Sequence, residues 1–384
     1  MEGPSEKAGA FPHDDGDPPA GGPFGDPAGD ADPGAWEPSP AQLQSYAALD
    51  LGTNNCRLLV ARPSRRGFRV VDAFSRIIRL GEGVSATGRL SEPAMQRTIE
   101  ALRICSDKLV RNRVLRSRLV ATEACRIADN GAEFLDRVRN DLGLSIEILS
   151  RESEAKLAVS GCASLIDTRS DLAMVFDIGG GSSELIWLDL TRAEATWRRT
   201  LAERLEAQHC IAAWTSLPVG VVTLAERFGG RHVTAEHFEA MVRHVEEMLR
   251  PFEAKHRFRE RMRGASTHLL GTSGTVTTVA GIQLGLPRYD RSKVDGCWLR
   301  VDAVRDTTYS LLGRSYEERV AEPCIGRDRA DLVLAGCAIL EALLRTWPCD
   351  RLRVADRGLR EGILAMLMAE DGAFRPDRKR RHPG

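Results

Sequence analysis

The sequence lacks the cysteine and histidine patterns that mark several protein classes. Its nine cysteines are scattered without any C-x-x-C pair, and it has only eight histidines. An odd cysteine count without close pairs fits neither a zinc ribbon nor a disulfide framework. His237 and His244 lie on one predicted helix, but no cysteine or third histidine is spaced to complete a metal site with them. We therefore expect reduced cysteines and structural or surface histidines.

Long apolar runs and a net charge are also absent. No stretch of eighteen or more apolar residues occurs, and a membrane-spanning helix needs about that many. The first residues include Glu2 and Glu6 instead of the basic segment that opens a signal peptide. The formal net charge is zero, so no global field attracts nucleic acid. These absences predict a cytoplasmic protein with no transmembrane segment and no specific nucleic-acid partner.

Lysine is scarce, with 6 lysines among the 54 basic residues. The planar arginine side chain binds phosphate oxygens in a bidentate way, so the excess of arginine is compatible with phosphate chemistry. A coding bias toward arginine, alanine and glycine explains the excess more simply. Only arginines that fall within motifs therefore enter the prediction of a site.

Both ends of the chain are poor in side chains that could form a core. Residues 1–44 are rich in glycine, proline, alanine and aspartate, and such a segment buries too little apolar surface to offset the entropy of ordering. Residues 373–384 contain a run of four basic residues that begins at Arg378. We expect a disordered acidic arm and a solvated basic tail on either side of the folded region.

Two glycine-centred turns share one pattern and carry most of the information in the chain. In residues 48–55 and again in residues 175–184, an apolar run ends in aspartate, passes through glycine and small polar residues, and resumes as a second apolar run. This pattern predicts a strand, a tight turn and a returning strand. Asp50 and Asp177 lie 127 residues apart, which predicts two related domains that face one phosphate-bearing ligand. We place these domains at residues 45–157 and 158–372.

Elsewhere, predicted strands alternate with predicted helices, which is the signature of an α/β protein. Ser91, followed by Glu92 and Pro93, begins one helix, and Gly143 ends another. Glu154 falls in the first turn of a third helix. In the second half we expect a strand and turn at 219–222, helices over 234–252 and 329–347, a strand over 352–355, and a last helix through Leu359, Ile363 and Met366.

The loop after Asp177 has the composition of a phosphate cradle. Three consecutive glycines let backbone N–H groups surround an anion, and two serines add hydroxyl donors. A carboxylate at the strand end can hold a cation that the anion also binds. The alternative is a glycine-rich hairpin that binds no ligand. The candidates for phosphate binding are Gly179, Gly180, Gly181, Ser182 and Ser183, followed by Glu184, together with Thr53 and Asn54 of the first loop.

A third glycine-rich turn follows a strand and begins a helix, where free N–H groups and the helix dipole favour an anion. It lacks the lysine of a Walker A loop and the spacing of a serine-esterase elbow. Phosphate binding and a simple tight turn both remain open for it. Its candidate residues are Gly271, Ser273, Gly274 and Thr275.

Two charged residues lie beside these turns. Arg126 follows a strand that ends at Ala121, at the edge where open α/β sheets bind their ligands. Bidentate phosphate binding and a surface salt bridge are both open for its side chain. Glu154, at the start of a helix, either faces the ligand or only provides favourable charge at the helix N-terminus.

In their order and spacing, these motifs resemble the exopolyphosphatase and guanosine pentaphosphate phosphohydrolase family. The resemblance implies an α/β fold in which two ribonuclease-H-like domains, of the kind found in actin-like ATPases, flank a cleft with mixed sheets and helices. We expect the short two-domain form, because longer members continue into an extra helical domain. The matching segments, from about Tyr46 to Glu370, are ALDLGTNN, ATEACRIADN, Glu154-Ala155, VFDIGGGSSEL, GTSGT and VADRGLREGIL.

Some positions depart from the family pattern. Arg151, Glu152 and Ser153 precede Glu154 where the family usually has Gly-Asn-Glu, and Thr53 and Asn55 replace common serines. Thr53 keeps a hydroxyl group, so we expect phosphate binding to survive.

The resemblance also implies roles for the candidate residues. Glu154 would position or deprotonate the attacking water, and Glu184 would assist it or its metal. Asp50 and Asp177 would serve Mg²⁺, or another divalent cation, and the phosphate. Arg126 would hold phosphate, while residues 179–183 would surround the terminal phosphoryl group.

The expected reaction is therefore release of orthophosphate from the end of polyphosphate. Guanosine pentaphosphate is the alternative substrate, and a homodimer is the expected assembly. A kinase of the same superfamily is a further alternative, since similar loops bind ATP there, and so is a non-catalytic sensor of alarmones or nucleotides. The presence of both glutamates favours turnover.

Overall fold

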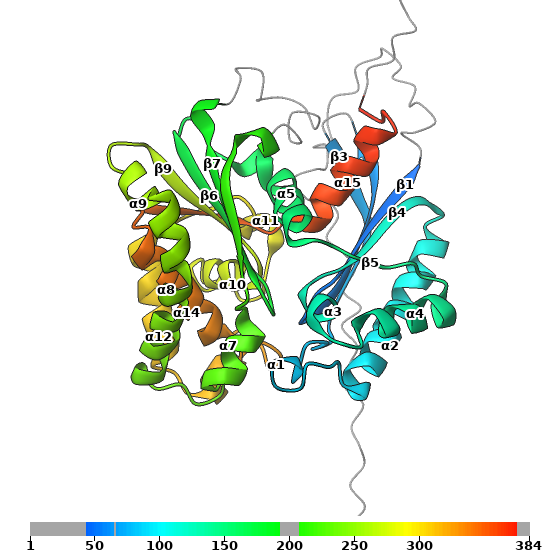
Figure 1. The fold of residues 1–384 in the computed structure, drawn as a ribbon, viewed down its shortest axis with the longest axis horizontal. Helices are drawn as coiled ribbons and strands as arrows, with labels where there is room; N and C mark the ends of the chain where they lie inside the picture. Colours follow the sequence, from blue (N-terminus) through cyan, green and yellow to red (C-terminus); the bar gives the residue numbers. More distant parts are fainter. Residues whose placement is uncertain (1–43, 65–66, 193–206, 375–384) are drawn as a thin grey trace, which may run out of the picture.

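The computed structural model describes residues 44–64, 67–192 and 207–374, which form two lobes side by side (Figure 1). The predicted arm at 1–44 and the basic tail lie almost entirely outside these described residues. Each lobe contains one mixed β-sheet with helices against it. The expected α/β class with mixed sheets is therefore confirmed.

The sheet of the first lobe has five strands in the order β3-β2-β1-β4-β5. Its first three strands are antiparallel neighbours, whereas β4 and β5 continue the sheet parallel to β1. The connection from β3 to β4 passes through helix α2, as a parallel crossover requires. The strands are β1 (Ser45–Leu51), β2 (Asn55–Ser64), β3 (Gly67–Ile77), β4 (Val114–Ala121) and β5 (Glu147–Ile148).

The second sheet has six strands in the order β10-β11-β9-β6-β7-β8. Strands β6, β7 and β8 are antiparallel neighbours, and β9 and β11 run parallel to β6. Without the antiparallel edge strand β10, the order and directions repeat those of the first sheet. The strands are β6 (Leu172–Ile178), β7 (Ser183–Asp189), β8 (Ile211–Leu217), β9 (Thr267–Thr272), β10 (Trp298–Arg300) and β11 (Arg351–Ala355).

The two predicted hairpins repeat one another in detail. The Gly52 amide donates to the Asn55 carbonyl over 2.9 Å, and the Gly179 amide donates to the Ser182 carbonyl over the same distance. Gly179 follows Gly52, and Ser182 follows Asn55, by the same 127 residues that separate Asp177 from Asp50. The strand–turn–strand prediction is confirmed at both places, and the repeat extends from the sequence pattern to individual hydrogen bonds.

Helices of the first lobe pack on the outer face of its sheet. Ser91 caps α2 by accepting a hydrogen bond from the Ala94 amide, and Gly143 ends α4 in a left-handed conformation. Both boundaries are as the sequence predicts. The apolar sides of these helices cover β1 and β2 in one core. The helices are α1 (Val84–Thr87), α2 (Glu92–Arg111), α3 (Glu123–Ile127) and α4 (Gly131–Leu142).

The second lobe carries a larger set of outer helices. Thr234 caps the longest one, α8, so the expected helix begins where predicted but ends four residues later, at His256. The helix expected at 329–347 begins only at Val333. The helices are α7 (Val221–Phe228), α8 (Ala235–His256), α9 (Phe258–Arg261), α10 (Gly274–Gln283), α11 (Arg291–Val294), α12 (Val301–Leu312), α13 (Tyr316–Ala321) and α14 (Val333–Thr346).

One predicted strand is wrong. Residues 219–222 do not form a strand, because β8 ends at Leu217 and α7 begins at Val221. Valine favours strands, but here the amides of Val221 and Val222 donate to the carbonyls of Gly179 and Gly180. This contact with the β6–β7 loop, which we call the second glycine loop, lies at the start of a helix. It overrides the preference of valine for a strand.

Helices α5 (Arg151–Cys162) and α15 (Leu359–Glu370) lie between the two sheets (Figure 1). They meet at backbone distance, because a Cβ on Gly161 would lie 1.8 Å from the Gly358 carbonyl oxygen, and one on Gly362 would lie 2.0 Å from that of Leu157. Ile363 and its neighbours in α15 pack against the first sheet. The last helix thus packs on the first lobe, although the predicted domain bounds of 45–157 and 158–372 assign it to the second. That division stays a prediction.

Candidate active site

A cavity opens between the two lobes at the tips of both glycine hairpins. We call it the main cavity. Its walls come from the β1–β2 and β6–β7 loops, the start of α10 and the first turn of α5. Of the predicted site residues it is lined by Asp50, Thr53, Asn54, Glu154, Asp177, Gly179, Gly180, Gly181, Ser182, Glu184, Ser273, Gly274 and Thr275.

The two glycine loops touch each other across the lobes. A Cβ added at Gly181 would lie 2.7 Å from the Thr53 hydroxyl oxygen, and one at Gly180 would lie 3.1 Å from the Asn54 amide nitrogen. These distances leave no room for a larger residue without a shift of one loop. The absence of a side chain at Gly180 and Gly181 therefore allows the two loops to meet, whether or not the glycines also bind a ligand.

Glu154 stands at the cavity wall in the first turn of α5, whose N-cap is Ser150. Its Oε2 accepts a hydrogen bond from Arg126 Nη2 over 2.6 Å, and both side chains are 13% exposed. Burial and the nearby charge of Glu184 raise the pKa of Glu154 well above its ordinary value, while Arg126 opposes this rise. The arginine therefore fixes the orientation of the carboxylate and favours its ionised form.

Arg126 makes two further contacts with the protein. Its Nη1 donates to Glu123 Oε2 over 2.8 Å, and its Nε donates to the Leu149 carbonyl over 3.0 Å. Glu123 in turn accepts from Arg151 over 2.6 Å. Arg126 does not line the main cavity. The structure places it behind Glu154 as part of a charged network.

Glu184 is held from the second lobe. Its Oε1 accepts hydrogen bonds from the hydroxyls of Ser182 over 2.8 Å and Ser216 over 2.9 Å. Burial, together with the charge of Asp177, raises its pKa to about 7, although the two hydroxyls lower it. Within the described residues, neither Glu184 Oε2 nor Glu154 Oε1 has a hydrogen-bond partner. Each glutamate thus has one anchored oxygen and one oxygen available to a ligand or water.

Asp50 and Asp177 are the last residue but one of the first strand of each hairpin, and both line the main cavity. Burial raises the pKa of each carboxyl, and the charge of Asp50 raises that of Asp177 further, while Arg57 lowers both. Two partly buried carboxylates that repel one another suit a hard divalent cation with oxygen ligands. Across the described parts of the chain, no group of three or more acidic, histidine or cysteine side chains is arranged to hold a metal. Mg²⁺ commonly takes one or two carboxylates and completes its shell with substrate phosphates and water, so the pair fits it.

The third glycine-rich turn behaves as expected at its helical end. Strand β9 ends at Thr272 and α10 begins at Gly274. Ser273 between them has φ of 107°, a conformation that a non-glycine residue rarely adopts. Its Oγ is buried and has no hydrogen-bond partner within the described residues. This combination of a rare backbone conformation and a polar atom in the cavity wall is typical of a ligand-binding turn.

Three predicted residues lie outside the wall of the main cavity. The Ser183 hydroxyl is buried and donates to the Val219 carbonyl over 2.7 Å. A Cβ at Gly271 would lie 2.6 Å from the Phe176 ring, so this glycine makes room for core packing. Arg126 is the third, as described above.

The sequence reasoning missed three charged residues that line the cavity: Arg57, Glu123 and Arg329. Arg57 could have been found from the hairpin repeat. It pairs with Asp50 across the first hairpin, at the position where Glu184 pairs with Asp177 in the second. Glu123 lies within the same ATEACR motif as Arg126. Arg329 precedes α14 in a loop with no recognisable motif.

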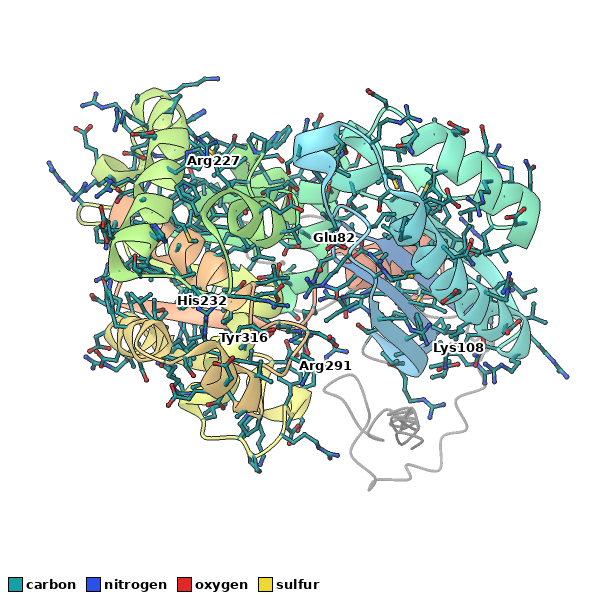
Figure 2. All side chains as sticks on the ribbon, turned by 90° about the horizontal axis from the view of Figure 1, so that it is seen from below. Glu82, Lys108, Arg227, His232, Arg291 and Tyr316 are labelled. Atoms are coloured by element: carbon teal, nitrogen blue, oxygen red, sulfur yellow. The ribbon has the colours of Figure 1, made fainter. Side chains whose placement is uncertain are left out.

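A second contact joins the lobes beside the main cavity. Arg79, with φ of 49°, binds Asp331 through two hydrogen bonds of 2.9 and 3.1 Å. The Gly83 amide donates to Glu226 over 2.8 Å. Figure 2 shows Glu82, the neighbour of Gly83, where the two lobes meet. The amide of Arg79 also donates to the Asn54 carbonyl, which ties this contact to the first glycine loop.

Comparison with known proteins identifies the family. Residues 59–370 match the model of the Ppx/GppA phosphatase family. A family member from Aquifex aeolicus is 28% identical with a TM-score of 0.66, over 85% of this chain and 98% of that chain. An exopolyphosphatase-like protein solved by the Northeast Structural Genomics Consortium is 27% identical with a TM-score of 0.72, over 85% and 99%.

The fold is shared more widely. An exopolyphosphatase from Cytophaga hutchinsonii is 22% identical with a TM-score of 0.71, over 85% of this chain and 98% of that chain. The expected two-domain actin-like fold is thereby confirmed. Among the described residues, no helix is long and apolar enough to cross a membrane. The family model covers most of the chain, and the chain belongs to the Ppx/GppA phosphatase family.

Proposed function

We propose that this protein is an exopolyphosphatase that releases orthophosphate from the end of inorganic polyphosphate. The observation that carries the proposal is the position of Glu154 and Glu184 in one cavity wall with both glycine loops. Each carboxylate is anchored through one oxygen, by Arg126 or by Ser182 and Ser216, and its other oxygen has no hydrogen-bond partner among the described residues. Two carboxylates held in this way beside a phosphate cradle can orient a water molecule.

Catalysis of phosphoryl transfer depends mainly on positioning and on charge stabilisation, since its transition state is loose. In the proposed complex, backbone N–H groups of residues 179–181 and the hydroxyl of Thr53 bind oxygens of the terminal phosphoryl group. Glu154 orients the attacking water and accepts its proton, and Glu184 assists it. The pKa values of both glutamates are higher than those of exposed carboxylates. A catalytic group with a pKa nearer to the working pH is better suited to proton transfer near pH 7.

Asp50 and Asp177 are the residues that would hold Mg²⁺ or another divalent cation. When bound, such an ion would neutralise charge on the phosphate oxygens. The homodimer and the cytoplasmic location expected from the sequence remain part of this proposal.

A phosphate-release assay tests the proposed function. The full chain is incubated with tripolyphosphate, long-chain polyphosphate and guanosine pentaphosphate, with and without Mg²⁺. We expect release from both polyphosphates in the presence of the cation. A higher kcat/KM for guanosine pentaphosphate would replace the proposed substrate, and absence of release from all three would refute the proposal.

Variants test the site. Glu154→Gln and Glu184→Gln should each lower kcat by about 100-fold or more, the usual effect of removing a general base. Glu152→Gln is the matched control, because Glu152 lies in the same helical turn but is 55% exposed and pairs with Lys156. Unchanged turnover in both glutamine variants would contradict the assignment.

A further inference from the structure

The end of the first sheet at which β1 begins carries a row of arginines. Arg62 of β2 and Arg69 of β3 are direct partners in the antiparallel register, so their side chains leave the same face of the sheet. Arg113 immediately precedes Val114, which pairs with Ser45 at the start of β1. All three arginines are exposed. We call Arg62, Arg69 and Arg113 the arginine row.

The arginine row has no acidic partner among the described residues. Arg62 Nε donates to the Ser45 hydroxyl over 3.0 Å, and within the described residues the side chains of Arg69 and Arg113 make no hydrogen bond and no ion pair. Like charges that lie directly opposite each other in a sheet repel one another. The positive charge of the row is therefore left uncompensated by the described part of the chain.

Carboxylates at this end of the lobe are already bound by other groups. Asp72 accepts hydrogen bonds from Lys108 over 2.7 Å and from Asn112 over 2.8 Å. Asp371 accepts from the Tyr46 hydroxyl over 2.9 Å and forms an ion pair with a fourth arginine. Neither carboxylate is therefore available to the row.

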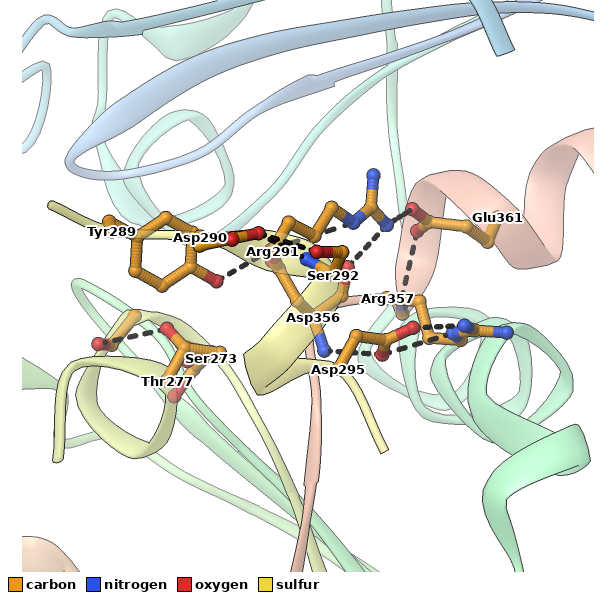
Figure 3. A network of polar contacts seen from close by, with 12 residues as sticks. Ser273, Thr277, Tyr289, Asp290, Arg291, Ser292, Asp295, Asp356, Arg357 and Glu361 are labelled. Carbon is orange, nitrogen blue, oxygen red and sulfur yellow. Dashed lines mark hydrogen bonds and ion pairs between the residues drawn. The ribbon is translucent and has the colours of Figure 1, made fainter. Parts of the chain in front are cut away.

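Arginines elsewhere in the protein show the contrast. In Figure 3, Arg291 binds Glu361 over 2.9 Å, and Arg357 forms an ion pair with Asp295. Each of these guanidinium groups has its own carboxylate, which offsets the cost of placing positive charges near one another. The arginine row departs from this arrangement, and its charge calls for an anionic partner beyond the described residues.

The chain itself supplies an anionic segment at this place. Residues 1–44, the predicted acidic arm, contain nine acidic residues and one lysine, and they join β1 at Ser45, beside Arg62. Glu37 is the acidic residue nearest to β1 and lies eight positions before Ser45. Eight residues span up to about 28 Å when extended, whereas neighbouring strands lie only about 5 Å apart. Glu37 is therefore within reach of the whole row.

We propose that the acidic arm binds back on the arginine row of its own chain and shields the row from other polyanions. Attachment at Ser45 gives the arm a local concentration on the order of millimolar, an advantage over free anions of similar affinity. Single contacts between exposed charges are weak and are screened by salt, so several carboxylates act together. The row lies at the opposite end of β1 from the main cavity, so the inference does not depend on the proposed function.

The basic tail is the competing partner for the arm. Helix α15 ends at Glu370, and the contact of Asp371 with Tyr46 brings this end of the chain to the start of β1. A contact between arm and tail would order two segments at once, whereas the backbone of the row is already fixed by the first sheet. The row therefore costs less conformational entropy and is the favoured partner.

Zero-length cross-linking of the full chain tests the contact. A carbodiimide joins a carboxylate to an amine but does not react with arginine, so Arg69→Lys introduces an amine into the row and keeps its charge. We expect cross-links between position 69 and acidic residues of the arm, identified by mass spectrometry. Their yield should fall about tenfold or more in about 1 M NaCl, where charges are screened within about 3 Å. A mixture of light and isotope-labelled chains checks that the links form within one chain.

Two amines at other places serve as controls. Arg89→Lys changes an exposed residue between α1 and α2, at the other end of the first lobe (Figure 1). Lys255 is an exposed native lysine in the last turn of α8, in the second lobe. Neither position adjoins the start of β1, so each should link to the arm at about a tenth of the yield of position 69 or less. Thermal unfolding checks that both variants remain folded.

Heparin chromatography tests the shielding, with heparin as the polyanion. The variant with Asp30→Asn, Asp32→Asn and Glu37→Gln changes only residues of the arm and weakens its charge. It should elute at a higher salt concentration than the wild type, because the uncovered row binds heparin. Addition of Arg62→Gln and Arg69→Gln should remove this gain.

A matched pair of substitutions accounts for net charge. Arg89→Gln with Arg259→Gln removes the same charge from exposed positions outside the row, so the arm variant should keep most of its gain with this pair. An equal loss with both pairs would overturn the shielding. Equal cross-linking of the arm to positions 69 and 89 would overturn the contact, and so would links to Lys379 of the tail in place of the row.

Discussion

Arg126 Nη2 and Glu154 Oε2 lie 2.6 Å apart in an ion pair that joins α3 to α5. Each of the three guanidinium nitrogens of Arg126 already donates a hydrogen bond within the protein. The acceptors are Glu123, Glu154 and the Leu149 carbonyl. The family resemblance implies that Arg126 holds phosphate, whereas the residues alone leave a salt bridge equally open. The geometry instead supports a positioning residue, which orients the carboxylate that would hold the attacking water.

Replacement of Arg126 should therefore act through Glu154. In Arg126→Gln we expect kcat to fall about 100-fold with a much smaller change in KM, because a misplaced catalytic group affects the transition state more than binding. Loss of the positive charge should also move the acid limb of the kcat profile to higher pH, since Arg126 lowers the pKa of Glu154. Measurement of kcat and KM from pH 5 to 9 checks both effects.

The conservative variant and a surface variant complete this test. Arg126→Lys keeps the charge and should return most of the pH profile while kcat stays low. Arg139→Gln removes an arginine that is 56% exposed and pairs with Asp136, so it should change neither quantity. If Arg126→Gln raised KM with an unchanged pH profile, a direct phosphate contact would be the better explanation.

The raised pKa of Glu184 predicts a pH-dependent stability. Its carboxyl keeps a proton up to about pH 7 in the folded state but ionises near 4.5 when exposed. Between these values the folded state holds a proton that the unfolded state releases, so the free energy of unfolding falls as pH rises. The loss amounts to about 3 kcal/mol, at 1.36 kcal/mol per pKa unit.

Urea denaturation of the wild type and Glu184→Gln at pH 4.5 and pH 8, without divalent cations, measures this loss. The glutamine variant lacks the titrating group, so its stability relative to the wild type should increase between the two pH values. Mg²⁺ should weaken the difference, because a nearby cation favours the ionised carboxyl. A wild-type stability that rises between pH 4.5 and pH 8 at the same rate as the variant would contradict the shift.

Much of the fold could be predicted from the chain because local signals and tertiary packing agree there. Asp50 and Asp177 end apolar strands, and glycine follows both, so the hairpins and their repeat are visible in the sequence. Ser91 and Gly143 bound their helices for the same reason. The strand expected at 219–222 failed because a contact with the second glycine loop, far away in the sequence, decides the local structure.

The site was only partly predictable for a related reason. A motif indicates which residues stand at a strand end, but not which way each side chain points. Ser183 and Glu184 are adjacent in β7, yet only Glu184 lines the cavity, because alternate residues of a strand face opposite sides. Arg329 lines the cavity from a loop without a motif, just before α14.

The contact between the two glycine loops predicts a steric effect. Gly181→Ala would place a methyl group 2.7 Å from the Thr53 hydroxyl, so one loop must move. We expect kcat/KM to fall at least about tenfold, since small misplacements at a reacting centre are costly. Gly313→Ala is the control, because the nearest atom to its added Cβ is 3.6 Å away. A smaller side chain at position 53 should restore part of the loss, so Thr53→Ala is combined with Gly181→Ala and compared with Thr53→Ala alone.

The paired hydrogen bonds between Arg79 and Asp331 predict an energetic coupling between the lobes. Both side chains are partly exposed, at 33% and 19%, so we expect a coupling energy of about 1 kcal/mol, at the upper end for such pairs. A double-mutant cycle with Arg79→Gln and Asp331→Asn, followed by urea denaturation, measures it. Because the Arg79 amide also holds the Asn54 carbonyl, Asp331→Asn should raise KM for polyphosphate as the first loop loosens. The exposed pair of Arg97 and Glu82 serves as the reference cycle. Equal coupling in the two cycles, with KM unchanged, would mean that the Arg79 contact does not help to hold the lobes together around the substrate.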